Sequence, residues 1–369
     1  MLKVIKRTLS DKTFLVTFIL AIIALLIGHV KTTDVNLQTI YSLTALLITV
    51  SIYQALGILK YIANYIVSKC SSSRTVFLVL MLCAFIGSML LTNDVAILTL
   101  VPIFFNIKKY MHLPSMTTIS LLTIFANLGS SVTPFGNPQN IYMVTFYKLS
   151  VSQFLSMSLM IGTISLGILF FSTLFIHSEK INVSFDNDQT IDQKKLVILM
   201  ILSIIVILGV LSIIPINIAL LISILVCLFL SKEAFLHIDY AVILTFVNFF
   251  IVVGAISRVA FVQNLMTVST QNPIATFISA SITSQLISNV PAAVLLSKFT
   301  NNVYALFLGV SVGGLGTLIA SLANLLALRQ YSAYSRNHTN FKFFKTFTLI
   351  NILFLIIFVL VGVSLLYLA

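Results

Sequence analysis

The sequence predicts an all-α polytopic membrane protein built as an inverted repeat. The first observation is composition: of 369 residues, 59% are hydrophobic and 8% are charged, and the mean hydropathy is +1.12. Soluble domains carry roughly 25% charged residues, which excludes a soluble fold. The second observation is a series of long apolar runs, and the third is that polar, Gly or Pro residues interrupt four of them. These features predict about nine full spans, two re-entrant helical hairpins and two broken transmembrane helices.

The full spans are the apolar runs that approach or exceed the roughly 20 residues of a bilayer crossing. They are residues 13–29, 39–57, 115–147, 156–177, 195–213, 216–231, 240–257, 303–328 and 345–367. The first of them follows a basic N-terminal segment and resembles a signal peptide. Because the run is long and no small-residue cleavage site follows, it is expected to be retained as a span.

Residues 75–106 and 273–300 are apolar but do not fit single spans. At about 1.5 Å per residue the first would form a helix roughly 48 Å long, whereas the hydrocarbon core is about 30 Å thick. LTND interrupts the first segment around Asn93, and ISNVP interrupts the second around Asn289. Each segment is therefore predicted to enter the membrane and return to the same side, with its polar tip facing protein or a water-filled cavity.

The distribution of basic residues predicts the orientation. With the N-terminus in the cytoplasm and each hairpin returning to its own side, 17 of the 21 Lys and Arg lie in cytoplasmic segments. The other four, on the outside, are Lys31, Lys148, Arg258 and Lys298. This bias follows the positive-inside rule, which also accounts for the net charge of +12 without a nucleic-acid partner.

The opposite directions of the hairpins predict two inverted repeats. Aligning residues 126–140 with 310–324, at an offset of 184, matches Gly129 with Gly313, Thr133 with Thr317 and Asn140 with Asn324. Each window follows a hairpin with an Asn at its tip. The predicted domains are 1–177 as first repeat, 178–215 as cytoplasmic linker and connecting helix, and 216–369 as second repeat.

The two windows are expected to unwind in mid-membrane. ANLGSSVTPFGNPQN and VSVGGLGTLIASLAN are rich in Gly, and the first also contains two Pro. Gly permits unusual backbone angles and Pro lacks an N–H donor, so a helix breaks there. The exposed helix ends would bind anions and coupling cations, as in inverted-repeat transporters. The alternative is close helix packing through small residues.

Asp94 is the one carboxylate predicted at membrane depth. Burying an Asp there costs about 2.5 to 3.5 kcal/mol, so an intramembrane acid indicates a function. It would exchange a proton or hold a transient Na⁺. The alternative is a cap on the second hairpin leg, a role compatible with coupling. The second tip is neutral, with Ser288 and Asn289, and Asp239 is expected to be an interfacial cap.

The sequence offers no support for enzymatic chemistry. It contains no nucleophile with a partnered base and no Walker-type loop, so ATP-driven transport would need another subunit. The three Cys residues are scattered and the five His lie at or beyond the ends of apolar runs, so no resident metal or other cofactor is expected.

Four motifs carry a family resemblance: LTNDVAILTLVPIFF, ANLGSSVTPFGNPQNIY, ISNVPAAVLL and GVSVGGLGTLIASLANLLALR. Together they resemble the ion transporter superfamily, specifically the anion permeases with a citrate transporter-like domain, which include SLC13-type and arsenite permease relatives. The resemblance spans essentially the whole chain. It implies a homodimer of scaffold and transport domains in which each protomer moves its substrate by an elevator-like shift.

The hairpin tips depart from one branch of that family. Relatives that transport dicarboxylates with Na⁺ carry Ser-Asn-Thr at both tips. Here the tips read Thr92, Asn93, Asp94 and Ser288, Asn289, Val290. The first more closely resembles arsenite-permease-like members, which leaves proton coupling and arsenite-type efflux open.

The sequence therefore predicts a secondary active transporter for a small inorganic or carboxylate anion, coupled to H⁺ or Na⁺. It is expected in the plasma membrane with its N-terminus inside. Alternatives are an arsenite-type efflux permease, a channel-like subunit of a multisubunit pump, and a non-transporting scaffold. The predicted binding residues are Thr92, Asn93, Asp94, Ser130, Thr133, Asn137, Asn140, Ser288, Asn289, Gly314, Thr317 and Asn324.

Overall fold

The computed structural model describes residues 2–27, 30–111, 113–180, 192–335 and 340–368. Within these ranges the chain is helical, and the only β-type pairing is an isolated bridge between Ser72 and Lys180. Long helices expose apolar side chains: in α19 (Asn340–Leu368), Leu349 is 71% exposed and Leu360 is 65% exposed. Such surfaces suit lipid rather than water, so the predicted all-α polytopic membrane fold is confirmed.

The helices before the linker follow the predicted order. They are α1 (Leu2–Leu9), α2 (Lys12–Ile27), the 3₁₀ turn η1 (Thr32–Asp34), α3 (Leu37–Ala55), α4 (Ile58–Ser68), α5 (Ser73–Leu90), α6 (Asn93–Ile107), the turn η2 (Lys108–Tyr110), α7 (Ser115–Ser130), α8 (Pro138–Tyr147) and α9 (Val151–Thr173).

The helices after the linker repeat this order. They are the connecting helix α10 (Gln193–Val210), then α11 (Ile216–Leu230), α12 (Ala234–His237), α13 (Tyr240–Ile256), α14 (Ala260–Ser269), α15 (Pro273–Ile287), α16 (Asn289–Leu296), α17 (Val303–Gly313), α18 (Leu322–Tyr334) and α19. Within the predicted linker and connecting helix 178–215, residues 181–191, which include Asp186 and Asp188, lie outside the described residues.

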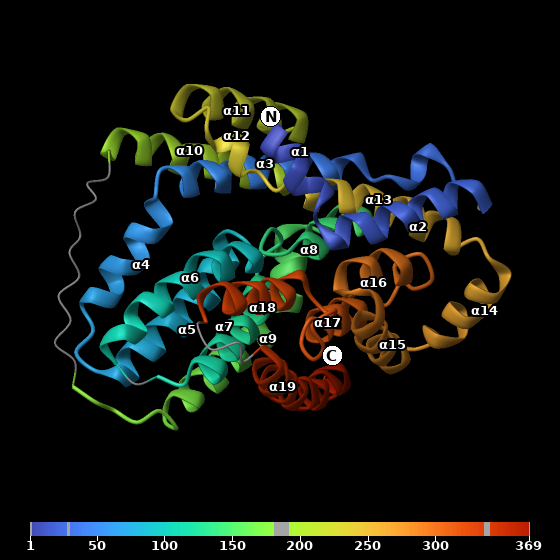
Figure 1. The fold of residues 1–369 in the computed structure, drawn as a ribbon. Coiled ribbons are helices and arrows are strands. Elements are labelled where there is room, and N and C mark those ends of the chain that lie inside the picture. Colours follow the sequence, from blue (N-terminus) through green and yellow to red (C-terminus); the bar gives the residue numbers. More distant parts are fainter. Residues whose placement is uncertain (1, 28–29, 112, 181–191, 336–339, 369) are drawn as a thin grey trace.

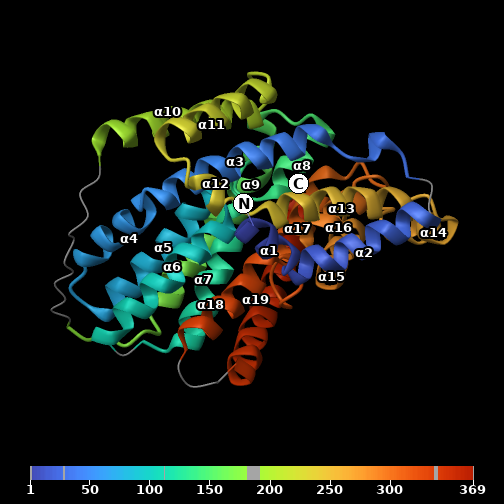
Figure 2. The same ribbon diagram turned by 45° about the horizontal axis from the view of Figure 1, so that its top comes forward.

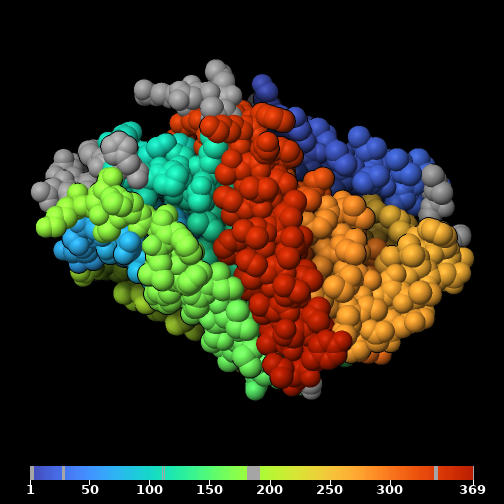
Figure 3. Space-filling model, turned by 90° about the horizontal axis from the view of Figure 1, so that it is seen from below, coloured from blue at the N-terminus to red at the C-terminus, as the bar shows by residue number. Residues whose placement is uncertain are grey.

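The helices form two groups (Figure 1). One contains α1, α2, α3 and α10–α13, and the other contains both hairpins, both broken helices, α9 and α19. In the rotated view α10 and α11 lie at one edge of the molecule and α19 lies toward the opposite edge (Figure 2). On the face seen in Figure 3, α19 runs between α9 and the helices α14 and α15.

Contacts between the two halves are reciprocal. Helix α2 of the first half packs on α13 of the second, and α11 of the second packs on α3 of the first. In the same way α6 packs on α18, and α16 packs on α8. An exchange of equivalent partners is what a twofold relation between repeats produces, so this packing supports the predicted repeat.

Both predicted hairpins break where the sequence is polar. Helices α5 and α6 pack on each other and are separated by two residues, and Thr92 caps α6 by accepting a hydrogen bond from the Val95 N–H. Helices α15 and α16 also pack together and meet at Ser288, whose φ of 76° is left-handed. Their re-entrant insertion into a membrane stays a prediction.

Both predicted broken helices are interrupted. The first ends at Ser130 and resumes at Pro138, where a missing N–H costs nothing in the first turn. The second ends at Gly313 and resumes at Leu322. The polar windows therefore form connections of turns and bends between half-helices.

Helices α4 and α14 differ from prediction, because the sequence placed connecting loops there. Gly57 adopts a left-handed φ of 68°, which turns the chain between α3 and α4 by 61°. Helix α14 follows α13 at 97°. The two corners occupy equivalent places, because α4 follows α3 and α14 follows α13. Their amphipathic residue patterns were too short to suggest spans.

Among the described residues, α5, α9, α10 and α19 are long and apolar enough to cross a membrane alone, and the number rises to six if each bent pair forms one span. Helices such as α2 and α11 are shorter apolar helices. The count of nine stays a prediction.

Candidate functional site

The predicted site lies where the interrupted helices meet. The N-termini of α6 and α16 are the hairpin tips, and the N-termini of α8 and α18 follow the breaks in the two long helices. Backbone N–H groups at helix N-termini attract anions, whereas carbonyls at C-termini attract cations. Hydrogen bonds between these segments show that the ends are in contact.

Asn127 is the centre of this hydrogen-bond network. Its Oδ1 accepts hydrogen bonds from Asn93 Nδ2 at 2.8 Å and from Ser321 Oγ at 3.0 Å. Its Nδ2 donates to Asn324 Oδ1 at 2.9 Å. All four residues are buried. One amide on α7 therefore connects the first hairpin tip to the start of α18.

Asn324 and Asn140 bind their own helix breaks in the same way. Asn324 Nδ2 donates to the carbonyls of Gly314 and Thr317, at 3.0 and 2.8 Å. Asn140 Nδ2 donates to the carbonyls of Ser130 and Thr133, both at 2.9 Å. The equivalent residues are each 184 positions apart: Asn140 and Asn324, Ser130 and Gly314, Thr133 and Thr317. The offset found by alignment thus coincides with equivalent hydrogen bonds.

Threonines anchor each break to its own hairpin. Thr133 Oγ1 donates to the carbonyl of Met89 at 2.6 Å, and Thr317 Oγ1 donates to that of Gln285 at 3.3 Å. Met89 and Gln285 lie four residues before the tip residues Asn93 and Asn289. Each hairpin and broken helix therefore form one connected unit.

The remaining predicted residues line the same junction. Asn137 Nδ2 donates to Ser130 Oγ at 3.4 Å, and Ser130 Oγ donates to the Asn127 carbonyl. At the second tip, the Asn289 N–H donates to the Ala320 carbonyl at 3.0 Å and Ser288 Oγ approaches the same carbonyl. The second tip is therefore bound to the α17–α18 break, beside Ser321.

Asp94 has one carboxylate oxygen without a hydrogen-bond partner among the described residues. Its backbone N–H donates to Asn93 Oδ1 at 3.0 Å, but its own Oδ1 is buried and accepts no hydrogen bond from the described residues. The carboxylate of Asp239, the N-cap of α13, repels it. A buried unpaired carboxylate is costly, so a bound proton or cation would stabilise it.

The two halves of the junction are not equally filled. Asn127 of the first repeat aligns with Ser311 of the second, and Asn324 aligns with Asn140. The Asn127–Asn324 pair is hydrogen-bonded, whereas Ser311 Oγ and Asn140 Oδ1 are both buried without a partner among the described residues. Where α7 meets α18, the amides of Asn127 and Asn324 therefore bond each other. Where α17 meets α8, the oxygens of Ser311 and Asn140 could instead accept a bond from a ligand or coordinate a cation.

Sequence reasoning missed Asn127, Ser321 and Gln285. Asn127 lies inside the first polar window, and Ser321 aligns with the predicted residue Asn137 at the same offset of 184. The repeat alignment therefore contained a signal for Ser321. Gln285 carried none, because its role depends on the α17–α18 connection: Gln285 Oε1 accepts from the Thr317 N–H at 2.9 Å.

The chain is similar to known membrane transporters. The citrate transporter family matches residues 1–305. An uncharacterized transporter of Methanocaldococcus jannaschii is 33% identical over 329 residues, covering 86% of this chain and 88% of that protein. The inner membrane protein YbiR of Escherichia coli is 28% identical over 308 residues, 80% of each chain. A Dictyostelium discoideum protein named as transporter arsB is 29% identical over 125 residues, covering 34% of this chain and 22% of its own.

Two helix breaks facing two hairpin tips and a family match over most of the chain lead to one conclusion: this protein belongs to the citrate transporter family and is a membrane transporter.

Proposed function

We propose that the protein is a secondary active transporter that moves a small inorganic or carboxylate anion, coupled to H⁺ or Na⁺. The observation that carries the proposal is the junction centred on Asn127, where a hairpin tip and both helix breaks meet beside the buried, unpartnered oxygen of Asp94. A structural scaffold gains nothing from such a costly arrangement.

The substrate chemistry follows from the groups that line the junction. They are neutral amides, hydroxyls and helix ends, and none of the described residues in these contacts is positively charged. The four helix N-termini supply partial positive charge, whereas Asp94 repels anions. A small anion of low charge, or one accompanied by a cation, suits this balance better than a free trianion.

Asp94 is the proposed coupling residue. Protonation or Na⁺ binding would neutralise its buried carboxylate and make the junction more attractive to an anion, so that the two bind together. The unpartnered oxygens of Asn140 and Ser311 are further candidate cation ligands, because Na⁺ prefers oxygen donors.

An arsenite-type efflux permease is the second candidate. It is favoured by the Thr92-Asn93-Asp94 tip and by the partial likeness to the protein named arsB. The elevator-like movement, the homodimer, the plasma membrane and the cytoplasmic N-terminus are proposed on the grounds given for the sequence.

Reconstituted protein tests this proposal. Thermal-shift screens with arsenite, citrate, succinate, sulfate and phosphate, with and without Na⁺, select the substrate. In proteoliposomes we expect Asp94→Asn to abolish accumulation driven by a pH or Na⁺ gradient, because the neutral amide cannot exchange the coupling ion. Asp192→Asn, which alters the cap of α10, is the control and should retain accumulation.

Two outcomes would contradict the proposal. Full gradient-driven accumulation by Asp94→Asn, with unchanged pH and Na⁺ dependence, would remove Asp94 from coupling. Flux that never saturates and never runs uphill would identify a channel instead of a carrier.

A further inference from the structure

A cavity of about 320 Å³ lies beside the α3–α4 corner. Its walls come from both groups of helices: Gln54, Gly57 and Lys60 belong to the corner, Thr99 and Asn106 to α6, and Tyr334 to α18. The cavity thus opens between the corner and the second leg of the first hairpin, beside the place where α4 packs on α6. Its lining mixes these polar side chains with apolar ones such as Leu98 and Ile103, and the exposed residues Lys60 and Asn106 give water access to it.

The cavity leads along α6 toward the proposed site. Leu98 and Pro102 line it, and they lie four residues apart on one face of α6. Asp94 lies another four residues toward the tip, on the same face and about 6 Å deeper. Asp94 therefore lies about one helical turn beyond Leu98, which is the lining residue of α6 nearest the hairpin tip.

Among the described residues that line this cavity, Lys60 is the one with a charged side chain. It is exposed and lies in the first turn of α4, and no carboxylate among the described residues lies within ion-pair distance of it. An unpaired cation in a pocket with low-dielectric walls raises the local concentration of anions.

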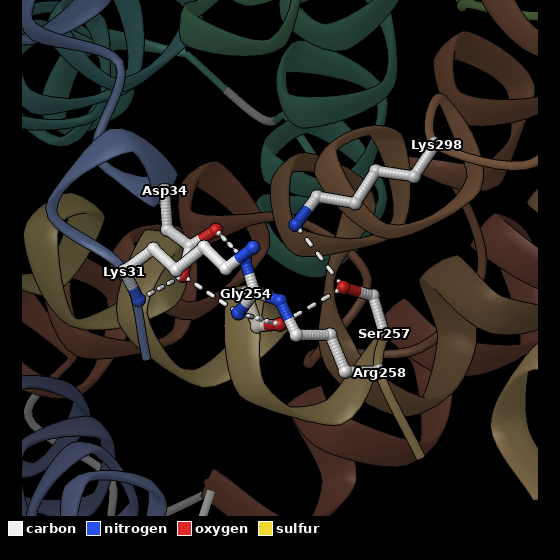
Figure 4. A network of polar contacts seen from close by, with 6 residues as sticks. All are labelled: Lys31, Asp34, Gly254, Ser257, Arg258 and Lys298. Atoms are coloured by element: carbon white, nitrogen blue, oxygen red, sulfur yellow. Dashed lines mark hydrogen bonds and ion pairs between the residues drawn. The ribbon is translucent and has the colours of Figure 1, made fainter. Parts of the chain in front are cut away.

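The corresponding corner of the second repeat is bridged instead (Figure 4). Lys298, just after the second leg of the second hairpin, donates to Ser257 Oγ at 3.2 Å, next to the α13–α14 bend. Arg258 at that bend pairs with Asp34, with distances of 2.5 and 2.9 Å (Figure 4). At this place the second repeat has a hydrogen bond between hairpin and corner, whereas the first repeat has a cavity beside the contact of α4 with α6.

We propose that this cavity is the access vestibule of the transport site in the conformation described, and that Lys60 makes it selective for anions. Its role in transport rests on the proposed function, whereas its existence and its electrostatic potential do not. The α14 side is the closed side of this conformation.

Charged thiol reagents test the vestibule without a transported substrate. Thr99→Cys is introduced into a chain in which Cys70, Cys83 and Cys227 are replaced by Ser. Its modification rates are measured with the anionic reagent MTSES and the cationic reagent MTSET. Because Lys60 attracts one reagent and repels the other, we expect Lys60→Gln to lower the MTSES/MTSET rate ratio by about three- to tenfold at low salt. The difference should shrink at high salt.

Lys69→Gln is the matched control, since Lys69 caps the other end of α4, where its ammonium lies over the Tyr65 ring. It should leave the ratio unchanged. Asn106→Cys, at the exposed end of the cavity, reports whether the folded protein reacts at all.

Two results would overturn the proposal. One is modification of Asn106→Cys but not of Thr99→Cys or a second deep variant, Leu98→Cys. The other is an unchanged rate ratio in Lys60→Gln. A shifted ratio together with normal coupling in Asp94→Asn would support the vestibule and refute the proposed coupling, so the two ideas fail separately.

Discussion

At the scale of single residues, Asn127 connects more of the site than any residue that the sequence singled out. It uses both ends of one buried amide, accepting from Asn93 and Ser321 and donating to Asn324. Removing a buried partner costs about 1 to 3 kcal/mol for each group left unsatisfied. The local sequence predicted the polar window, but the choice of Asn127 depended on contacts nearly 200 residues away.

Asn127→Ala should therefore destabilise the protein by about 2 to 4 kcal/mol, because it leaves several buried groups without partners. The aligned change Ser311→Ala should cost less than about 1 kcal/mol, since Ser311 Oγ has no hydrogen-bond partner to lose in the part of the chain that the structure describes. Thermal unfolding in detergent, followed with a thiol-reactive dye that detects exposure of buried Cys227, measures both. Equal melting temperatures for the two variants would contradict the assigned network.

At the scale of elements, close packing between each hairpin and its broken helix requires glycine. A Cβ on Gly129 would lie 2.2 Å from the Phe85 carbonyl oxygen, and one on the aligned Gly313 would lie 2.6 Å from Ser284 Oγ. Both α7 and α17 thus approach the first leg of their hairpin at the same point. The alignment predicted this pair of glycines, but only the packing shows why they are needed.

Gly129→Ala should lower stability by about 1 to 3 kcal/mol, because the backbone atoms it meets cannot move aside without shifting α5. Gly87→Ala is the control on α5: nothing lies within 4 Å of the added Cβ, so it should be neutral or stabilise by up to about 1 kcal/mol. The same dye-based melting assay distinguishes them. A neutral Gly129→Ala would mean that α5 and α7 do not pack this closely.

The helices α4 and α14, which form the two corners, were not predicted from the local sequence. Their sequences are short and mixed, and hydropathy assigned them to loops with Lys60, Lys69 and Arg258. A left-handed Gly57 and packing of α4 against α5 and α6 make the first corner helical. Tertiary contacts thus overrode a weak local signal.

At the scale of the whole molecule, the two halves are joined by an ion pair as well as by apolar packing. Arg258 follows α13 and Asp34 precedes α3, and their side chains are 27% and 5% exposed. Burial would raise the pKa of Asp34, but hydrogen bonds from Arg258 and the Lys31 N–H, with the charge of Arg258, outweigh it and hold that pKa below its ordinary value.

Asp34→Asn should destabilise the folded protein by about 1 kcal/mol at pH 7. Because the folded-state pKa is lowered, this contribution is present above the unfolded pKa of about 3.9 and is lost as pH falls through the folded value. Circular dichroism melts from pH 7 to pH 3 should therefore show the wild type and the variant converging below about pH 4. A constant difference across this range would contradict an electrostatic origin.

Composition and local sequence patterns were enough to predict the membrane class, the positions of the polar breaks and the two hairpin tips, and the alignment revealed the internal match at 184 residues. These follow from composition and from local rules for Gly, Pro and helix caps, which need no knowledge of distant contacts. Only the tertiary structure decided that Asn127 bridges Asn93 and Asn324, that α4 and α14 form corners, and that the cavity lined by Lys60 lies beside one corner while Lys298 bridges the other. The physical reason is that a hydrogen-bonded junction and a cavity are properties of several segments together, and hydropathy along the chain carries no information about which segments meet.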